Sequence, residues 1–134
     1  MAMTTTGRAG LLLCAASIAI ALSGCGSPAP PTLLRAGDDG SAVAVRVGDV
    51  LTVRLGSNLT TGHRWRLRDA GDGVLEATGW RYEPAPSPPL GAGGEEVWRF
   101  TALRAGSTRL ILEYVAADGE TVAGSFAVSV SVSG

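Results

Sequence analysis

Phe126-Ala127-Val128-Ser129-Val130-Ser131-Val132, near the end of this chain of 134 residues, decides the fold class. An apolar side chain stands at every second position with alanine or serine between, and a period of two is typical of a strand with one buried face. The alternation recurs along the chain, and no window of helical period competes with it. The sequence predicts seven strands, at residues 42–47, 50–56, 63–69, 74–83, 95–103, 107–115 and 121–132.

Turn signals such as Gly48-Asp49 and Ala117-Asp118-Gly119 separate these strands. Short, regularly spaced strands with one apolar face suit two sheets packed face to face. We therefore expect an all-β domain over residues 41–134, an immunoglobulin-like antiparallel β-sandwich of about seven strands. We expect aromatic side chains to fill the core, namely Trp65, Trp80, Tyr82, Trp98, Tyr114 and Phe126.

Three connections are long or irregular, at residues 57–62, 84–94 and 116–120. If successive strands alternate in direction, these three connections fall at the same end of the sandwich, and the tight turns fall at the other. Loops on a rigid sheet scaffold commonly carry binding function. The sequence therefore predicts a binding surface made of these three loops.

The N-terminus has the features of a bacterial export signal. Arg8 supplies a positive charge, and residues 11–22 form an apolar run that is too short to span a membrane but suits a signal peptide. Leu22-Ser23-Gly24-Cys25 then resembles the lipobox, whose cysteine is lipidated and becomes the new N-terminus. We expect residues 1–24 to be removed and residues 25–40, rich in Pro, Gly and Asp, to form a flexible tether. The protein would then be an exported lipoprotein, anchored to a membrane through lipid on its cysteine, at the cell surface or the periplasmic face.

Composition and rare residues argue against several functional classes. With 12 acidic and 11 basic residues the net charge is −1, which offers no electrostatic attraction for nucleic acid. Cys14 lies in the signal, so Cys25 would be the only cysteine left, without a partner for an internal disulfide or a cysteine-based metal site. No catalytic constellation surrounds His63, the only histidine, and the adjacent Glu95 and Glu96 would point to opposite faces of a strand. We expect no catalysis, no metal and no cofactor.

Two loop motifs resemble those of chagasin-type inhibitors of papain-like cysteine proteases. Asn58-Leu59-Thr60-Thr61-Gly62, followed by Trp65, is similar to the NPTTG…W stretch of that family. Leu90-Gly91-Ala92-Gly93-Gly94 is similar to its glycine-rich second loop. The resemblance covers about residues 41–132. Further similar positions are Ala105-Gly106, Leu112 and Tyr114.

The resemblance implies a protein that blocks a papain-like cysteine protease without covalent chemistry. Residues 57–62 would enter the cleft near the catalytic cysteine, residues 84–94 would lie alongside, and residues 116–120 would make a third contact. Prolines before the glycine-rich motif would stiffen that loop and reduce the entropy lost on binding. The protease-binding residues implied are Asn58, Leu59, Thr60, Thr61, Gly62, Leu90, Gly91, Ala92, Gly93, Gly94, Ala116, Ala117 and Asp118.

Two loops depart from the family pattern. Leu59 stands where proline is usual, so the first loop is less rigid. Tyr114 is followed by Val115-Ala116-Ala117-Asp118-Gly119, without the usual Arg-Pro-aromatic motif. Because arginine and aromatic side chains are typical anchors of an interface, we expect a weaker third contact.

Two other hypotheses remain open at this point. The first is a lipid-anchored immunoglobulin-like module that binds an envelope protein or a glycan and has lost inhibitory activity, which the altered third loop favours. The second is an enzyme, which the lack of a catalytic constellation disfavours. In each case we expect a monomer.

Overall fold

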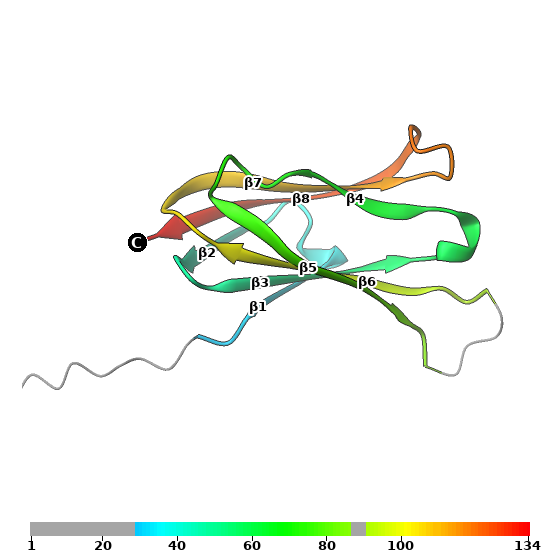
Figure 1. Cartoon of the computed structure of the whole chain (residues 1–134), viewed down its shortest axis with the longest axis horizontal. Helices are drawn as coiled ribbons and strands as arrows, with labels where there is room; N and C mark the ends of the chain where they lie inside the picture. The colour runs from blue at the N-terminus through cyan, green and yellow to red at the C-terminus, as the bar shows by residue number, and fades with distance from the viewer. Residues whose placement is uncertain (1–28, 87–90) are drawn as a thin grey trace, which may run out of the picture.

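The computed structural model describes residues 29–86 and 91–134, which form two four-stranded sheets packed face to face (Figure 1). The β-sandwich expected from the alternation is confirmed, with eight strands in these residues rather than seven. The strands are β1 (Thr32–Arg35), β2 (Ala42–Arg46), β3 (Val50–Ser57), β4 (Arg64–Asp69), β5 (Leu75–Pro84), β6 (Gly94–Ala102), β7 (Gly106–Val115) and β8 (Val122–Ser133). Two short 3-10 helices are η1 (Ala36–Asp38) and η2 (Leu59–Thr61).

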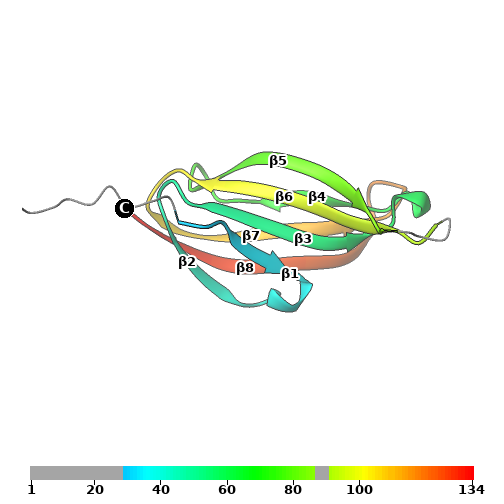
Figure 2. The same cartoon turned by 90° about the horizontal axis from the view of Figure 1, so that it is seen from below.

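We call the sheet with strand order β1-β3-β6-β5 sheet A and the sheet with order β2-β8-β7-β4 sheet B. Figure 2 shows the two layers from below. Most neighbours are antiparallel, as expected, but β1 pairs with β3 and β2 pairs with β8 in parallel. The chain changes sheet between β1 and β2, and it changes back at the turn after β2, where Asp49 N donates to Arg46 O. Strands β2 and β3 are therefore not hairpin partners.

The tether predicted over residues 25–40 is wrong for its second half. Strand β1 pairs with β3 from Thr32 opposite Leu51 to Arg35 opposite Arg54. Leu34 of β1 is only 3% exposed and belongs to the core. Burial of this apolar side chain stabilises the short strand. Residues 25–28, including the expected lipidation site Cys25, lie outside the described residues.

The core lies between the inner faces of the two sheets. In β3, Leu51, Val53 and Leu55 alternate with more exposed residues and are at most 1% exposed. Two phenylalanines, Phe100 of β6 and Phe126 of β8, contribute the largest fully buried side chains from opposite sheets. Truncating a buried phenylalanine to alanine typically costs about 3–5 kcal/mol. The alternation in the sequence therefore identified seven of the eight described strands and most of their buried faces.

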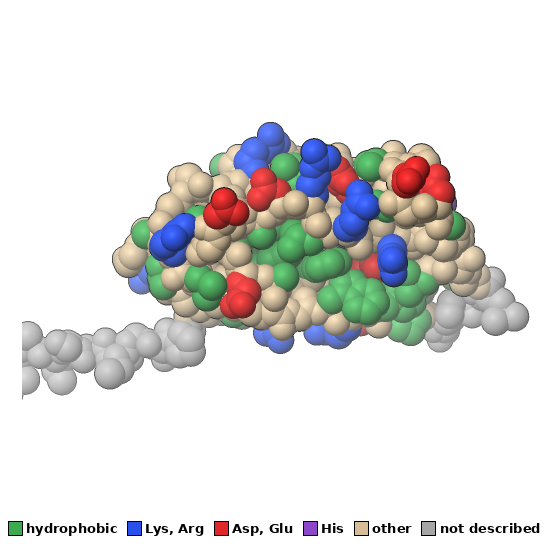
Figure 3. Space-filling model, turned by 45° about the horizontal axis from the view of Figure 1, so that its top comes forward, with side chains coloured by type: hydrophobic (Ala, Val, Ile, Leu, Met, Phe, Trp, Pro, Cys, Tyr) green, Lys and Arg blue, Asp and Glu red, His purple; other side chains and the backbone are tan. Residues whose placement is uncertain are grey.

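The aromatic core expected from the sequence is only partly present. Phe126 is buried, and Trp65 and Trp98 are partly buried against the core, but Trp80 is 51% exposed. Trp80 lies on β5, which is the edge of sheet A, and β4 is the edge of sheet B on the same side. Figure 3 shows hydrophobic side chains gathered across the face between these edges. On this side the sandwich is therefore more open than expected from a core that buries all six aromatic side chains.

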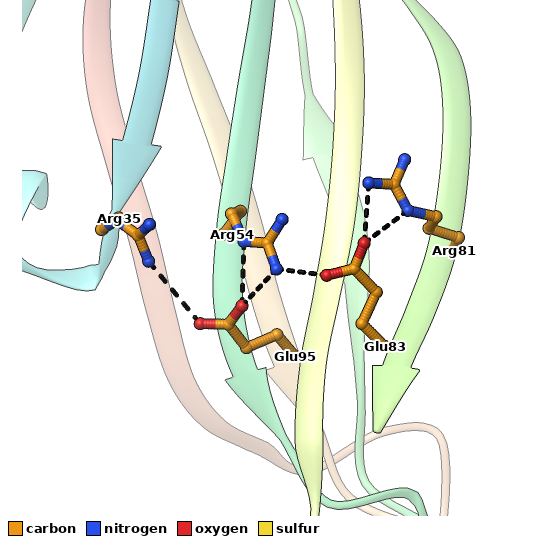
Figure 4. Close-up of polar contacts among 5 residues, drawn as sticks. All are labelled: Arg35, Arg54, Arg81, Glu83 and Glu95. Atoms are coloured by element: carbon orange, nitrogen blue, oxygen red, sulfur yellow. Dashed lines mark hydrogen bonds and ion pairs between the residues drawn. The ribbon is translucent and has the colours of Figure 1, made fainter. Parts of the chain in front are cut away.

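A row of ion pairs crosses the outer face of sheet A (Figure 4). Arg54 of β3 bridges Glu95 of β6, at 2.7 Å, and Glu83 of β5. Arg35 of β1 approaches Glu95, and Arg81 contacts Glu83, so the row touches all four strands. Hydrogen bonds from Arg81 and then Arg54 lower the pKa of Glu83. Exposed pairs contribute little individually, but this connected row joins β1 to the rest of the sheet.

The described chain enters and leaves the domain at the same pole. Thr32 is level with Leu51, near the start of β3, whereas Ser57 ends β3 at the opposite pole. The C-terminus lies at the entry pole as well (Figure 1). Within the described ranges, no helix has the length and apolar composition needed to cross a membrane. All described strands and buried core residues lie between Thr32 and Ser133, so a chain of residues 26–134 retains the whole described domain.

Candidate functional site

Three connections meet at the pole opposite the chain entry, as both ribbon views show (Figures 1 and 2). They join β3 to β4, β5 to β6, and β7 to β8. We call their described residues, 58–63, 85–86, 91–93 and 116–121, the rim. The side-chain Nδ2 of Asn58 donates to the carbonyl oxygen of Gly91 over 3.0 Å. A Cβ placed on Gly62 would lie 2.6 Å from Cβ of Ala117, so the first and third loops are also in close contact.

The β3–β4 loop is held in shape by its own polar groups. Asn58 caps η2, because its Oδ1 accepts hydrogen bonds from the backbone nitrogen of Thr60 at 3.1 Å and from the Thr60 hydroxyl at 2.5 Å. The Thr61 hydroxyl donates to the backbone oxygen of Asn58 at 2.7 Å. Gly62 ends the turn with a φ of 79°, a conformation that glycine adopts without strain. Leu59 and Thr60 are left exposed at the tip.

Aromatic residues support this loop from below. The phenol oxygen of Tyr114 in β7 accepts a hydrogen bond from the backbone nitrogen of Asn58 at 3.1 Å. The ring of Tyr114 lies 5.1 Å from that of Trp65 and 5.4 Å from that of His63. Trp65 Nε1 in turn donates to the carbonyl oxygen of Gly56 at 2.9 Å. Strands β3, β4 and β7 therefore fix the loop jointly, across both sheets.

A buried carboxylate lies beneath the same loop. Glu96 of β6 has no exposed surface, and its Oε2 accepts a hydrogen bond from the backbone nitrogen of Trp65 at 2.7 Å. This contact links sheet A to sheet B directly below the rim. The neighbouring Glu95 points to the outer face, where it pairs with Arg54, so the expectation that the two acids do not converge is confirmed. The sequence reasoning missed the role of Glu96, although its inward position follows from the strand alternation.

Close backbone contacts require glycine in the β5–β6 loop. Gly93 has a φ of 77°, and a Cβ there would lie 2.9 Å from the carbonyl oxygen of Ser57. A Cβ on Gly94 would lie 2.2 Å from the carbonyl oxygen of Glu83. Gly94 pairs with Pro84 as the last rung between β5 and β6, so the loop is shorter than the predicted 84–94. These glycines let the second loop lie against the first.

The β7–β8 loop is a compact turn that uses its acid internally. Asp118 Oδ1 accepts from the backbone nitrogens of Glu120 and Thr121, and its Oδ2 accepts from the Thr121 hydroxyl at 2.5 Å. The Thr121 hydroxyl, followed by these backbone donors, lowers the pKa of Asp118 from 3.8 to about 2. The carboxylate thus orders the turn, and Ala117 provides the contact with Gly62.

The rim offers no arrangement for catalysis or metal binding in the described residues. His63 Nδ1 lies 2.9 Å from the Thr61 hydroxyl, but no carboxylate is hydrogen-bonded to the His63 ring among the described contacts. No group of three or more His, Cys, Asp or Glu side chains gathers in residues 29–86 and 91–134. What the rim presents is a shaped, exposed and internally hydrogen-bonded protrusion, which suits binding to a concave partner.

Two sequence comparisons match this chain to known proteins. A profile described as "Chagasin family peptidase inhibitor I42" matches residues 44–130. Chagasin from Trypanosoma cruzi is 31% identical over 81 residues, which cover 58% of this chain and 74% of that protein. The chain belongs to the chagasin family of peptidase inhibitors. Family membership places it among inhibitors rather than enzymes.

Solved structures of similar fold include a cysteine protease inhibitor. The cysteine protease inhibitor EhICP2 from Entamoeba histolytica has a TM-score of 0.68 and 20% identity, and covers 77% of this chain and 96% of its own. Amebosin, solved in solution, has a TM-score of 0.65 and 22% identity, over 78% of this chain and all of its own. PbICP-C, solved in complex with falcipain-2, has a TM-score of 0.60 and 14% identity, over 76% of this chain and 99% of its own. The chagasin-family sandwich is therefore the fold of this chain.

The structure brings together most of the residues that the chagasin resemblance singled out. The β3–β4 loop carries Asn58, Leu59, Thr60, Thr61 and Gly62. Gly91, Ala92 and Gly93 lie in the second loop and Ala116, Ala117 and Asp118 in the third, while Gly94 begins β6. Leu90 lies outside the described residues.

Proposed function

We propose that this protein inhibits papain-like cysteine peptidases by seating its rim in the active-site cleft, without covalent chemistry. The observation that carries the proposal is the joining of three loops at one pole, with Asn58 bonded to Gly91 and Gly62 packed on Ala117, in a chain of the chagasin family. A chain of similar fold, PbICP-C, is solved in complex with falcipain-2. Family membership favours this function over the module that has lost inhibitory activity.

The mechanism follows from exposure and rigidity. Leu59 and Thr60 protrude at the tip of the first loop, where they would block the approach of a substrate to the catalytic cysteine. The glycine-rich loop would lie beside them, because glycines allow a partner backbone to come close. Hydrogen bonds within the loops fix their shape before binding, which reduces the entropy lost on association. The third loop contributes a small alanine contact instead of an arginine or aromatic anchor, so it adds less affinity.

The direct test is titration of papain with the chain of residues 26–134. We expect stoichiometric or competitive inhibition in the nanomolar-to-micromolar range, and full papain activity at high micromolar protein would contradict the proposal. Thr60→Arg places a long cation at the tip and should raise the inhibition constant by about tenfold or more. Ser131→Arg, on the exposed face of β8 near the chain-entry pole, is the matched control and should leave inhibition unchanged.

We also propose that the protein is an exported lipoprotein, with Cys25 lipidated after removal of residues 1–24. The support is the sequence: a positive residue, a short apolar run and a small-residue site before the cysteine. The acyl chains would anchor the domain at a membrane, on the cell surface or the periplasmic face. Cys25→Ser should abolish incorporation of labelled fatty acid and release the protein from the membrane fraction. Retention of both in the variant would overturn this proposal.

We propose that the inhibitor acts as a monomer, because a single copy carries all three loops of the rim. Light scattering of the chain of residues 26–134 should give the mass of one copy. A dimer at micromolar concentration would contradict this.

A further inference from the structure

A groove of about 640 Å³ opens on the side of the sandwich between the edge strands β4 and β5. Its walls include the inner-face residues Trp65 and Leu67 of β4, Trp80 of β5, and Glu96 and Trp98 of β6. Hydrophobic side chains cover this side of the molecule, with arginines beside them (Figure 3). We call this feature the tryptophan groove.

One wall of the groove holds a buried carboxylate oxygen without a partner. Glu96 has no exposed surface, and its Oε2 is satisfied by the backbone nitrogen of Trp65. Its Oε1 has no hydrogen-bond partner among the described residues, and neither has the buried Nε1 of Trp98. Buried polar atoms are nearly always paired, so such atoms beside an open groove indicate a place for a ligand's polar group.

The tryptophan walls of the groove suit a positive charge. Tryptophan has the aromatic face most favourable to a cation, and the half-exposed Trp80 stands at the edge strand opposite Trp65. A carboxylate that keeps one oxygen unpaired complements a guanidinium or ammonium group. Arg64 and Arg66 also border the groove, but Arg66 is held by Glu113 at 3.0 Å and by the carbonyl oxygen of Gly119. Its charge is therefore already partly compensated.

The groove is continuous with the rim. The end of the groove nearest the rim is lined by residues of the first and third loops, namely Leu59, Gly62, Ala116, Ala117 and Gly119. A peptidase seated on the rim would therefore place its own surface over the mouth of the groove. The occupant of the groove should therefore be a part of the bound peptidase.

We propose that the tryptophan groove receives a basic side chain, arginine or lysine, from the peptidase that the rim holds. The proposal rests on the inhibitory function proposed above and adds a selectivity determinant to it. The cation would lie between the tryptophan faces with its charge towards Glu96 Oε1, and direct contact with this buried oxygen would require a shift of the side chains that cover it. Peptidases with a basic residue beside the cleft on this side would be bound more tightly than those without one.

The first experiment tests the groove without a peptidase. Nα-acetyl-arginine methylamide is titrated into ¹⁵N-labelled protein of residues 26–134, and the indole N–H signals of the three tryptophans are followed, each assigned by a Trp→Phe variant. We expect saturable shifts of the Trp80 and Trp98 signals. The citrulline analogue has the same shape without the charge and should bind about tenfold more weakly, as should the arginine probe to Glu96→Gln. Equal binding of both probes, or no shift with either, would overturn the proposal.

The second experiment returns to inhibition and separates the two proposals. Papain and two cathepsins that differ in basic residues beside the cleft are titrated with the wild type, Trp80→Ala and Leu103→Ala, the last an exposed control outside the groove. Trp80→Ala should raise the inhibition constant about tenfold for peptidases that present a basic residue there, and Leu103→Ala for none. Inhibition of all three that is indifferent to Trp80→Ala would overturn the peptidase occupant alone. Lack of inhibition by the wild type would overturn the inhibitory function, whatever the probes show.

Discussion

The side-chain amide of Asn58 spans two loops, because its Oδ1 caps the 3-10 turn of the first loop while its Nδ2 donates to the carbonyl oxygen of Gly91 in the second. A single half-buried residue thus contributes both to the shape of one loop and to its distance from the next. Its backbone nitrogen is held in turn by the phenol of Tyr114. Asn58 therefore joins the first loop both to the second loop and to strand β7.

Asn58→Ala should raise the inhibition constant substantially and lower the free energy of unfolding only slightly. Loss of a side-chain cap costs typically about 1 kcal/mol of stability. Loss of the Gly91 contact frees the second loop as well, and we expect the inhibition constant for papain to rise by about ten- to a hundredfold. Inhibition assays and thermal unfolding of the same preparation check this. Ser131→Ala, on the exposed face of β8, is the control; an unchanged inhibition constant for Asn58→Ala would show that the cap is dispensable.

Gly93→Ala should disturb the rim, and Gly91→Ala should not to the same degree. Both glycines have positive φ, but a Cβ on Gly93 would meet the carbonyl oxygen of Ser57 at 2.9 Å, whereas a Cβ on Gly91 would meet no atom of the described residues within 4 Å. The strain of φ alone costs about 1 kcal/mol in each variant. The additional clash should make Gly93→Ala the less stable of the two in urea denaturation. Equal unfolding midpoints would mean that the loop shifts freely away from Ser57.

A chain that begins at Ser41 should be markedly less stable than one that begins at Gly26. It loses β1, the buried Leu34 and the Arg35 end of the ion-pair row. Removal of a buried leucine side chain alone costs about 2–5 kcal/mol, and the free edge of β3 adds to the loss. Leu34→Ala in the longer chain separates the core contribution from that of the strand. If the two chains unfold at the same urea concentration, β1 contributes nothing to the fold.

Asp118→Ala should lower stability at neutral pH but lose its effect in acid. The folded-state pKa of Asp118 is about 2, below the 3.8 of an unpaired aspartate, so the charged form is favoured by folding. The stabilisation is complete above about pH 4 and falls as the pH drops towards 2. The melting temperatures of wild type and variant should therefore converge over this range. A constant difference from pH 6 to pH 2 would show that the Thr121 contacts do not depend on the charge.

The alternation in the sequence predicted seven strands to within one residue at every boundary, because each has one buried face. Strand β1 was missed because Thr32-Leu33-Leu34-Arg35 is short and follows prolines, and only pairing with β3 makes it a strand. Trp80 was wrongly expected in the core, since the sequence does not show that β5 is an edge.

The site was predictable where it depends on loops and motifs. Alternating strand direction placed the three connections at one pole, and the resemblance identified their residues. The contact between Glu96 and the backbone of Trp65 was not predictable, because it depends on how far apart the two sheets pack and not on spacing along the chain. The tryptophan groove was missed for the same reason.

If Cys25 is lipidated as proposed, the pairing of β1 with β3 limits how far the protein can reach from a bilayer. With lipid on Cys25, only residues 26–31 precede the first strand, and fully stretched they extend at most about 20 Å. Since β1 enters at the pole far from the rim, the rim would then point away from the bilayer surface and stay close to it. Such a molecule would intercept enzymes that arrive from the surrounding medium, and its own cell's membrane-embedded neighbours would lie behind it.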